Sequence, residues 1–221
     1  MQTFDDWPDR YARWFESGIG RLVKRFELDL TLELLQPRPG ETILDAGCGS
    51  GIFTAPIIER GVNVVGIDLS GPMLHHARDT LPAANFSPLA ADIRVLPFTD
   101  GQFDRVVSIT ALEFVAEGQQ AMDELFRVTR PGGRVVVATL NRLSPWARRR
   151  ESAARADSVF RHAIFRSPDE LAGLTPVDGV IRNAIHFAKD VDPGEAEAIE
   201  REGAARGQAT GAFVIGAWKR P

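Results

Sequence analysis

The sequence predicts an α/β fold with a doubly wound, mostly parallel sheet and helices on both of its faces. Four short runs are almost continuously apolar and rich in β-branched residues, which is typical of strands buried on both faces of a parallel sheet. They are residues 42–45, 62–67, 105–109 and 134–138. Longer and more polar segments separate these runs. Because strands that alternate with helices are joined by right-handed crossovers, we expect them to pair in parallel.

The segments between the strands have the signals of helices. Residues 22–35 place apolar side chains close to helical spacing, and Pro37 ends this helix because proline cannot continue it. Residues 121–128 repeat the pattern. Ser70, with a proline two positions later, has the features of an N-cap residue followed by proline in the first turn.

Weaker signals complete the predicted architecture. Residues 85–90, 179–187 and 211–218 predict three further strands, the last of them closing the sheet. Ser167 begins a capping-box pattern, and residues 193–206 predict a charged, alanine-rich helix. No linker rich in serine and glycine divides the chain, so we expect a single domain.

Composition and charge exclude several classes of protein. The 221 residues have a formal charge of -4 and a pI of about 5.6, so the chain is a poor candidate for coating nucleic acid. Its one cysteine, Cys48, permits no internal disulfide and no zinc site built on cysteines, and no metal site is predicted. No apolar run matches a membrane span, and the beginning of the chain lacks the features of a secretory signal. The expected location is cytoplasmic.

A glycine-rich loop follows the first predicted strand. Gly47, Gly49 and Gly51 alternate there, which allows the backbone to turn tightly and to approach a ligand. In the dinucleotide-binding pattern G-x-G-x-x-G the third glycine comes one position later, where this chain has Ile52. Asp45, two residues before the loop, would oppose a pyrophosphate. This spacing and this acid suit a ligand that carries an ammonium and a sulfonium group.

An acidic residue also ends the second predicted strand. Asp68 can accept hydrogen bonds from both vicinal hydroxyl groups of a ribose. Ribose recognition is therefore predicted whichever cofactor carries the ribose. A nucleotide-dependent oxidoreductase on a Rossmann-like fold and a non-catalytic cofactor-binding module remain as alternatives to an enzyme that uses a sulfonium cofactor.

Five segments in order resemble the motifs of one family. They are residues 45–51, 66–70, 91–98, 103–112 and 130–134. Together they resemble the class I S-adenosylmethionine-dependent methyltransferases, in particular the small-molecule group that includes the ubiquinone and menaquinone methyltransferases. The resemblance implies a Rossmann-like methyltransferase fold with seven strands, the last one antiparallel, and S-adenosyl-L-methionine as the cofactor.

The resemblance also implies how the chain is organised. Residues 1–221 would form one methyltransferase domain, in which residues 41–140 bind the cofactor. Residues 1–40 would provide an N-terminal lid and a helix. Residues 141–221 would provide the substrate-side segment and the closing strands.

A role for individual residues follows from the same resemblance. The implied cofactor-binding residues are Tyr11, Asp45, Gly47, Cys48, Gly49, Gly51, Asp68, Leu69, Met73, Asp92, Ile93 and Thr110. Asp45 would lie near the ammonium group, and Asp68 would hold the ribose. Asp92 would accept a hydrogen bond from the adenine amino group, Thr110 would lie where the methyl group leaves, and Tyr11 would belong to an aromatic lid.

The predicted function is the transfer of a methyl group to a small-molecule or lipid-like acceptor. Because the sulfonium already makes the methyl group electrophilic, positioning for in-line transfer is the expected main effect, and no catalytic residue is assigned. Glu113, His162 and His186 could face the substrate, although surface or core positions are the more common role of such residues. Methylation of nucleic-acid bases is disfavoured because no Asn-Pro-Pro-Tyr-like motif follows the fourth strand.

The segment of residues 141–166 is strongly basic. It holds seven arginines and two acids, a local charge of +5, and Trp146 and Phe160 lie among the arginines. Such a segment suits an acidic or lipid-like acceptor, or contact with a membrane surface. The alternative is that the cluster Arg148, Arg149 and Arg150 forms a solvated helix face or pairs with acids elsewhere. The oligomeric state is not predicted.

Overall fold

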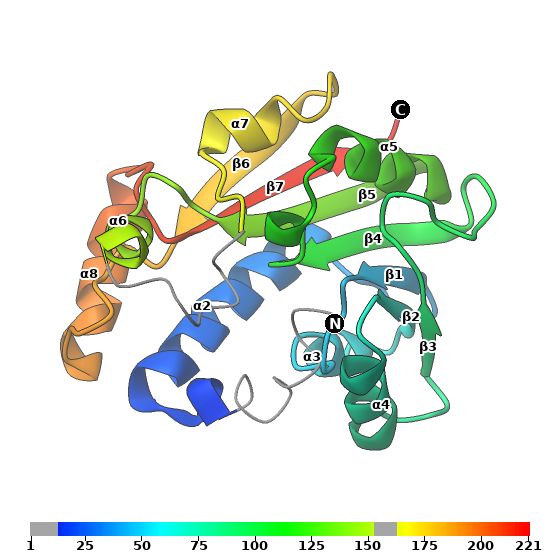
Figure 1. The fold of residues 1–221 in the computed structure, drawn as a ribbon, viewed down its shortest axis with the longest axis horizontal. Coiled ribbons are helices and arrows are strands. Elements are labelled where there is room, and N and C mark those ends of the chain that lie inside the picture. The colour runs from blue at the N-terminus through cyan, green and yellow to red at the C-terminus, as the bar shows by residue number, and fades with distance from the viewer. Residues whose placement is uncertain (1–12, 153–162) are drawn as a thin grey trace.

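A seven-stranded sheet runs through the computed structural model, which describes residues 13–152 and 163–221 (Figure 1). The strand order is β3-β2-β1-β4-β5-β7-β6. The strands are β1 Thr42–Ala46, β2 Asn63–Asp68, β3 Phe86–Ala90, β4 Phe103–Ile109, β5 Thr129–Leu140, β6 Gly179–Ala184 and β7 Phe213–Lys219. Only β7 runs antiparallel to its neighbours β5 and β6; β1 to β5 pair in parallel. The predicted fold class and the antiparallel last strand are confirmed.

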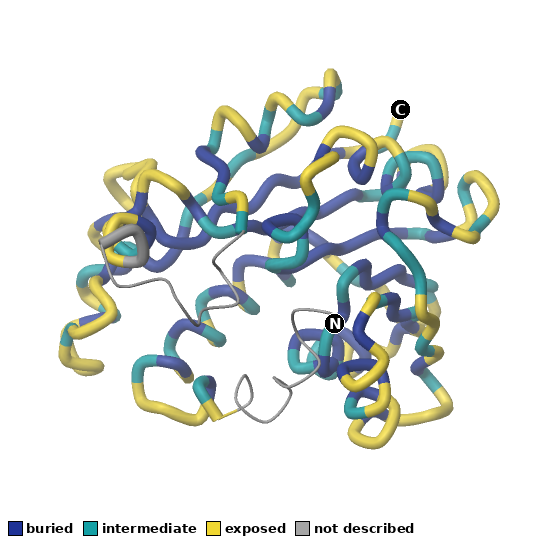
Figure 2. The backbone as a smooth tube through the Cα atoms, viewed as in Figure 1, coloured by how far each residue is buried: buried dark blue, intermediate teal, exposed yellow. Residues whose placement is uncertain are grey.

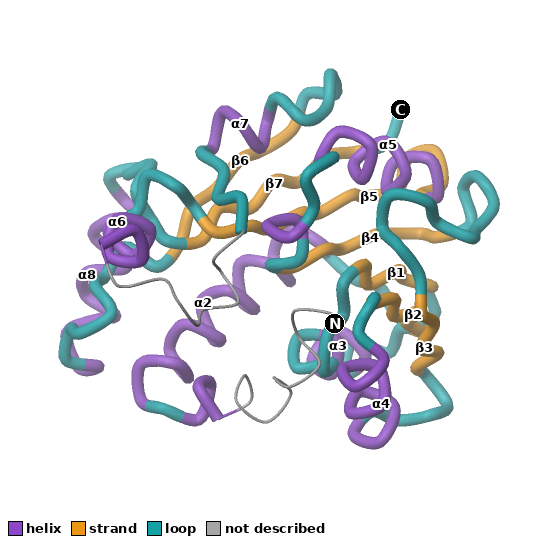
Figure 3. The backbone as a smooth tube through the Cα atoms, in the orientation of Figure 1, coloured by secondary structure: helices purple, strands orange, loops and turns teal. Residues whose placement is uncertain are grey.

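Helices cover both faces of this sheet (Figure 3). They are α2 Gly18–Leu35, α3 Thr54–Ile58, α4 Gly71–Thr80, the 3₁₀ turn η1 Leu112–Phe114, α5 Gly118–Val128, α6 Pro145–Ser152, α7 Pro168–Ala172 and α8 Pro193–Ala205. Apolar side chains of α2, α3, α4 and α8 pack in the core on one face, and those of η1, α5 and α7 pack in the core on the other.

Successive side chains of the central strands pack alternately into these two cores. Ile43 belongs to the core under α2, and Leu44 belongs to the core under α5. Val106 and Val107 of β4 divide in the same way. The strands are therefore buried along both faces (Figure 2), which explains why their sequences are continuously apolar rather than alternating.

Most predicted element ends agree with the structure. The Ser70 side chain accepts a hydrogen bond from the Met73 N–H, and both hydrogen bonds of the Ser167 capping box are present. Two boundaries were predicted wrongly. The strand expected at residues 134–138 begins earlier, because residues 129–133 already belong to β5 across a register shift between β4 and β5. The expected strand at residues 179–187 ends at Ala184, because Ile185 has a left-handed φ of 66°.

A buried ion pair ties α8 to the end of β6. His186 Nδ1 lies 3.2 Å from Glu200 Oε2, and the two side chains are 1% and 8% exposed. The same carboxylate accepts hydrogen bonds from the backbone N–H groups of Ile185 and His186. Burial disfavours the charged form of both groups, but their hydrogen bond and charge attraction have the larger combined effect. Glu200 therefore raises the pKa of His186, and His186 lowers the pKa of Glu200.

We expect Glu200→Gln to lower the free energy of unfolding by about 3 kcal/mol near pH 5.5. The raised pKa of His186 gives stability that is present below its usual 6.5 and is lost as pH rises through the folded-state value. The lowered pKa of Glu200 gives stability that is present above its usual 4.5 and is lost as pH falls through the folded-state value. Urea denaturation at several pH values should therefore find the largest difference between variant and wild type between about pH 4.5 and pH 6.5. A difference that is independent of pH would contradict the assignment.

No helix in the described ranges is long and apolar enough to cross a membrane. The cytoplasmic location stays a prediction.

Candidate functional site

The glycine loop lies at the carboxyl end of β1, and its positions need glycine for two different structural reasons. Gly47, Gly49 and Gly51 have φ values of 84°, 53° and 82°. A Cβ at Gly47 would lie 2.3 Å from the Ala111 Cβ, and one at Gly51 would lie 2.7 Å from Leu81 Cδ1. A Cβ at Gly49 would meet no atom within 4 Å. The first and third glycines are therefore required by packing, whereas the second faces open space from which a ligand can reach the backbone.

Asp68 joins this loop to the end of β2. Its Oδ2 accepts a hydrogen bond of 2.9 Å from the Gly49 N–H, and its Oδ1 accepts one of 2.8 Å from the Ser70 N–H. Each carboxylate oxygen has one of these donors and retains accepting capacity for another. Burial raises the pKa of Asp68 above its usual range, although these hydrogen bonds act to lower it. The carboxylate is therefore oriented and largely desolvated, with free lone pairs.

Asp45 lies at the other side of the loop and is almost completely buried. The residue is 2% exposed, and its Oδ2 accepts a hydrogen bond of 2.6 Å from the Thr54 hydroxyl. Burial raises its pKa to about 7, the Thr54 hydrogen bond lowers it, and the negative charge of Asp68 raises it further. No ion pair neutralises Asp45 or Asp68 within the described part of the chain. A cationic ligand would relieve this crowding of negative charge.

Residues predicted to contact adenine lie at the adjoining ends of β2 and β3, where Asp68 pairs with Ala90. Leu69, two residues before α4, is 53% exposed, whereas Met73 and Ile93 are largely buried. Asp92 is bound by Arg94, whose Nε and Nη2 donate to Asp92 Oδ2 at 3.1 and 2.6 Å. The side-chain hydrogen bonds from Arg94 lower the pKa of Asp92. The role of Asp92 stays a prediction, and an adenine amino group would share its carboxylate with Arg94.

Thr110 carries local backbone strain at the carboxyl end of β4. Its φ is 49°, in the left-handed region that β-branched residues rarely adopt, and its N–H donates to the Ala138 carbonyl. The next residue, Ala111, contacts Gly47 of the loop. Strain of this kind collects at functional sites, and here it lies on the strand end next to Asp45.

We expect Thr110→Gly to be more stable than Thr110→Ala by about 1 kcal/mol. Both substitutions remove the same hydroxyl and methyl groups, but only glycine adopts a positive φ without a steric penalty. Thermal denaturation of the two variants gives the comparison. Equal melting temperatures would mean that the left-handed backbone at this position carries no strain.

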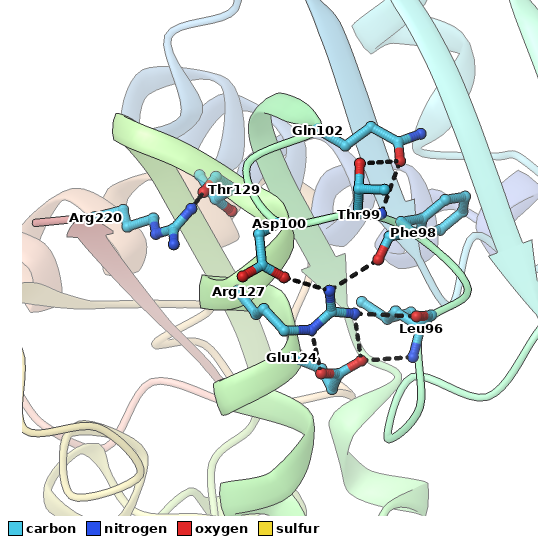
Figure 4. Close-up of polar contacts among 9 residues, drawn as sticks. All are labelled: Leu96, Phe98, Thr99, Asp100, Gln102, Glu124, Arg127, Thr129 and Arg220. Atoms are coloured by element: carbon cyan, nitrogen blue, oxygen red, sulfur yellow. Dashed lines mark hydrogen bonds and ion pairs between the residues drawn. The ribbon is translucent and has the colours of Figure 1, made fainter.

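Arg127 organises the loop that leads from the adenine-side residues to β4 (Figure 4). Its Nη1 donates to the Phe98 carbonyl and to Asp100, and its Nη2 donates to the Leu96 carbonyl. Glu124 holds the guanidinium at 2.6 and 2.9 Å and accepts from the Leu96 N–H. Sequence reasoning did not identify Arg127 or Glu124. Their i, i+3 spacing was the only local signal, since their loop partners lie about 30 residues earlier.

Other candidates from the sequence lie away from the loop or outside the described residues. Tyr11 and His162 lie outside them. Phe15, in the segment expected to provide the N-terminal lid and helix, is buried and packs edge-on against Phe53 at 5.7 Å between ring centroids. Cys48 is buried, and burial raises the pKa of its thiol, which does not favour a nucleophilic role. Among the described residues, no group of three or more His, Cys, Asp or Glu side chains could hold a metal ion.

Glu113 is fully buried rather than exposed to a substrate. Its Oε1 accepts a hydrogen bond from the Leu140 N–H, and its backbone carbonyl accepts one from the Ile164 N–H. Burial raises its pKa to about 7. The interpretation as a core residue that joins η1 to the end of β5 therefore agrees with the structure.

The described arginines of the basic segment are largely engaged with the protein. Arg142 forms an ion pair with Glu170 at 3.0 Å, and Arg149 forms one with Asp190 at 3.1 Å. Arg166 is buried and donates to the carbonyls of Leu112 and Val115. Arg148 is exposed and donates to the Leu143 carbonyl. Pairing with acids elsewhere thus accounts for part of the local charge.

Sequence comparisons find related proteins for the central part of the chain. Residues 44–137 match the model of a methyltransferase domain family. A demethylmenaquinone methyltransferase of Beutenbergia cavernae is 39% identical over 147 residues, which are 65% of this chain and 58% of that protein. A malonyl-[acyl-carrier protein] O-methyltransferase of Erwinia pyrifoliae is 44% identical over 133 residues, 56% of this chain and 50% of that protein. The chain spans about half the length of these curated relatives.

Solved structures share the fold over almost the whole chain. An SAM-dependent methyltransferase of Thermotoga maritima has a TM-score of 0.73 at 24% identity, with 99% of this chain and 98% of that chain covered. A geranyl diphosphate C-methyltransferase of Streptomyces coelicolor has a TM-score of 0.65 at 19% identity, with 88% and 75% covered. At these identities the likeness concerns the fold. The chain is therefore similar to S-adenosylmethionine-dependent methyltransferases, in sequence over its central residues 44–137 and in fold over almost its whole length.

Proposed function

We propose that this protein transfers a methyl group from S-adenosyl-L-methionine to a small-molecule or lipid-like acceptor. The observation that carries the proposal is the pair of carboxylates on the two sides of the glycine loop, Asp45 buried and Asp68 partly buried, whose pKa values are both raised by burial. A ligand that brings an ammonium and a sulfonium group together with ribose hydroxyls satisfies both the negative charge and the free lone pairs. A dinucleotide would add the negative charge of a pyrophosphate to the same place.

The residues at the strand ends fit the parts of this cofactor. In the proposal, Asp45 holds the ammonium group and the loop glycines line the methionine part, with Gly49 open to it. Asp68 accepts from the ribose hydroxyls. Leu69, Met73, Asp92 and Ile93 surround the adenine, and Thr110 lies beside the methyl group. Tyr11 and Cys48 keep the roles implied by the family resemblance, the first as part of a lid and the second as a loop residue.

The proposed chemistry needs positioning more than acid or base groups. The bound sulfonium supplies an electrophilic methyl group. This chain holds the cofactor through its carboxylates and orients an acceptor in line with the methyl carbon, and such positioning contributes on the order of 7–11 kcal/mol. No residue is assigned as a general base.

We further propose that the cofactor site belongs to residues 41–140 and that the flanking residues 1–40 and 141–221 select the acceptor. Leu143 and Ile164 are exposed apolar side chains at the carboxyl edge of β5, where acceptors bind in this class of fold. Exposed apolar side chains beside Arg148 suit an acceptor with an apolar body and an acidic group, and they suit peripheral contact with a membrane surface. The names of the relatives, which concern demethylmenaquinone and malonyl-[acyl-carrier protein], are compatible with such acceptors.

Two titrations and one transfer assay test this function. Calorimetry should detect binding of S-adenosyl-L-methionine and no binding of NAD. Protein incubated with a cell extract and methyl-labelled cofactor should then yield a labelled metabolite in mass spectrometry. Binding of NAD alone would support the oxidoreductase interpretation, and cofactor binding without any labelled product in extracts or lipid fractions would support a non-catalytic module.

We expect Arg148→Gln to raise the acceptor KM about two- to fivefold and to flatten its dependence on salt, with cofactor affinity unchanged. The estimate corresponds to the loss of one exposed charge interaction. Arg149→Gln is the matched control, because Arg149 is already paired with Asp190. If both variants turn over like the wild type at every salt concentration, the arginines form only a solvated face.

A further inference from the structure

A polar cavity lies at the end of the sheet opposite the glycine loop. It has a volume of about 240 Å³ and is formed by the amino-terminal ends of β4 and β5, the turn after α2 and the end of β7. Five cationic side chains line it: Arg38, Arg105, Arg130, Arg134 and Lys219. The proposed methyl transfer uses none of them.

Two of these five charges are neutralised within the protein. Arg105 binds Glu41 through two hydrogen bonds of 2.6 and 3.0 Å, and the two side chains are 7% and 10% exposed. Arg130 forms an ion pair of 3.1 Å with Asp104. Arg105 and Asp104 are both part of the cavity wall.

The other three charges have no carboxylate of their own. In the described ranges, no ion pair involves Arg38, Arg134 or Lys219. The cavity and its paired acids therefore carry an excess of three positive charges on a chain whose net charge is -4. Burial and the like charges of Arg105 and Arg38 lower the pKa of Arg134.

A structural role accounts for part of this cluster only. Arg105 Nη1 donates to the Leu35 carbonyl at 2.7 Å, and Arg134 Nη1 donates to the Leu34 carbonyl at 3.0 Å. These two bonds satisfy carbonyl groups at the carboxyl end of α2, where positive charge is favourable. They do not explain why Arg38 and Lys219 gather at the same cavity, and they leave further N–H donors of the Arg134 guanidinium free.

We propose that this cavity binds a small phosphate-bearing molecule, whose oxygens are held by Arg38, Arg134 and Lys219. Arginine presents a planar fork of N–H donors that matches phosphate oxygens, and lysine adds a compact charge. The volume is below the range of drug-sized ligand pockets, so it suits a phosphate or diphosphate group with a small remainder. S-adenosyl-L-methionine has no phosphate, so the site is distinct in chemistry as well as in place.

Calorimetry with inorganic pyrophosphate on the full chain tests the proposal. At constant ionic strength, we expect one pyrophosphate to bind and the double variant Arg38→Gln/Lys219→Gln to bind it at least about tenfold more weakly. The control Arg78→Gln/Arg201→Gln removes two exposed arginines from α4 and α8 and should bind like the wild type. Thermal melting shows whether the variants fold, and Arg134→Gln, which also loses the bond to α2, serves as a second cavity variant.

Several results would overturn the proposal. One is equal weakening in the cavity variant and in the control, which would mean general charge attraction. Another is the absence of pyrophosphate binding to folded wild-type protein. A third is an equal affinity for malonate, which would assign the cavity to carboxylates. Because S-adenosyl-L-methionine binding is measured separately and should be unchanged in the cavity variants, failure here is distinguishable from failure of the proposed methyl transfer.

Discussion

Gly49→Val should fold like the wild type and lose measurable binding of S-adenosyl-L-methionine, a decrease of at least about a hundredfold in affinity. Gly49 faces open space, since a Cβ there meets no protein atom within 4 Å. A branched side chain would occupy the space from which the proposed cofactor approaches the backbone. Its φ of 53° adds strain of about 1–2 kcal/mol, which lowers stability without removing the fold.

The neighbouring glycine provides the matched comparison. A Cβ at Gly47 would lie 2.3 Å from the Ala111 Cβ, so Gly47→Ala should lose stability through packing inside the protein. Calorimetry for binding and thermal melting for stability separate the two effects. Gly49→Val protein that is folded and binds the cofactor like the wild type would show that the ligand does not approach this loop.

The sequence predicted the cofactor side of the fold well because the signals there are local. Asp45, the loop glycines and Asp68 lie within one strand–loop–helix–strand unit of fewer than 30 residues. Apolar strands that alternate with capped helices are joined by right-handed crossovers, and this alternation is enough to predict a parallel sheet. The ends of β5 and β6 were predicted less well, because they depend on a register shift and on the left-handed Ile185.

Contacts between residues far apart in the chain could not be predicted from the sequence. Arg134 follows Arg38 by 96 residues and Lys219 follows Arg134 by 85, and only the folded sheet brings the three to one cavity. The partners of Arg127 lie in a loop that precedes it by about 30 residues. The sequence also gave no reason for Arg94 to bind Asp92, or for Arg142 and Arg149 to find Glu170 and Asp190. Charge pairing between distant segments has no periodicity that a sequence pattern can reveal.

The buried acid beside the loop links the stability of the protein to its proposed function. The pKa of Asp45 is raised from the usual 3.8 to about 7, so ionising this carboxyl opposes folding. The contribution of Asp45 to the stability of the free protein should therefore decline as pH rises from about 4 to about 7 and stay level above that, a change on the order of 4 kcal/mol. A bound ammonium group reverses the sign, because it favours the ionised carboxylate. Cofactor binding below pH 7 should consequently release a proton.

Asp45→Asn should make the free protein more stable at pH 8, by about 1–2 kcal/mol, and should weaken cofactor binding at least about tenfold. The variant removes the cost of the buried charge, although part of this gain is offset by amide N–H groups that find no acceptor. Its stability should lose the part of the pH dependence between about 4 and 7 that the wild type owes to Asp45, and its binding should release no proton from this position. Urea denaturation and calorimetry in two buffers of different ionisation enthalpy measure both effects. A variant that is less stable and still binds the cofactor tightly would mean that Asp45 serves the fold through Thr54 rather than the ligand.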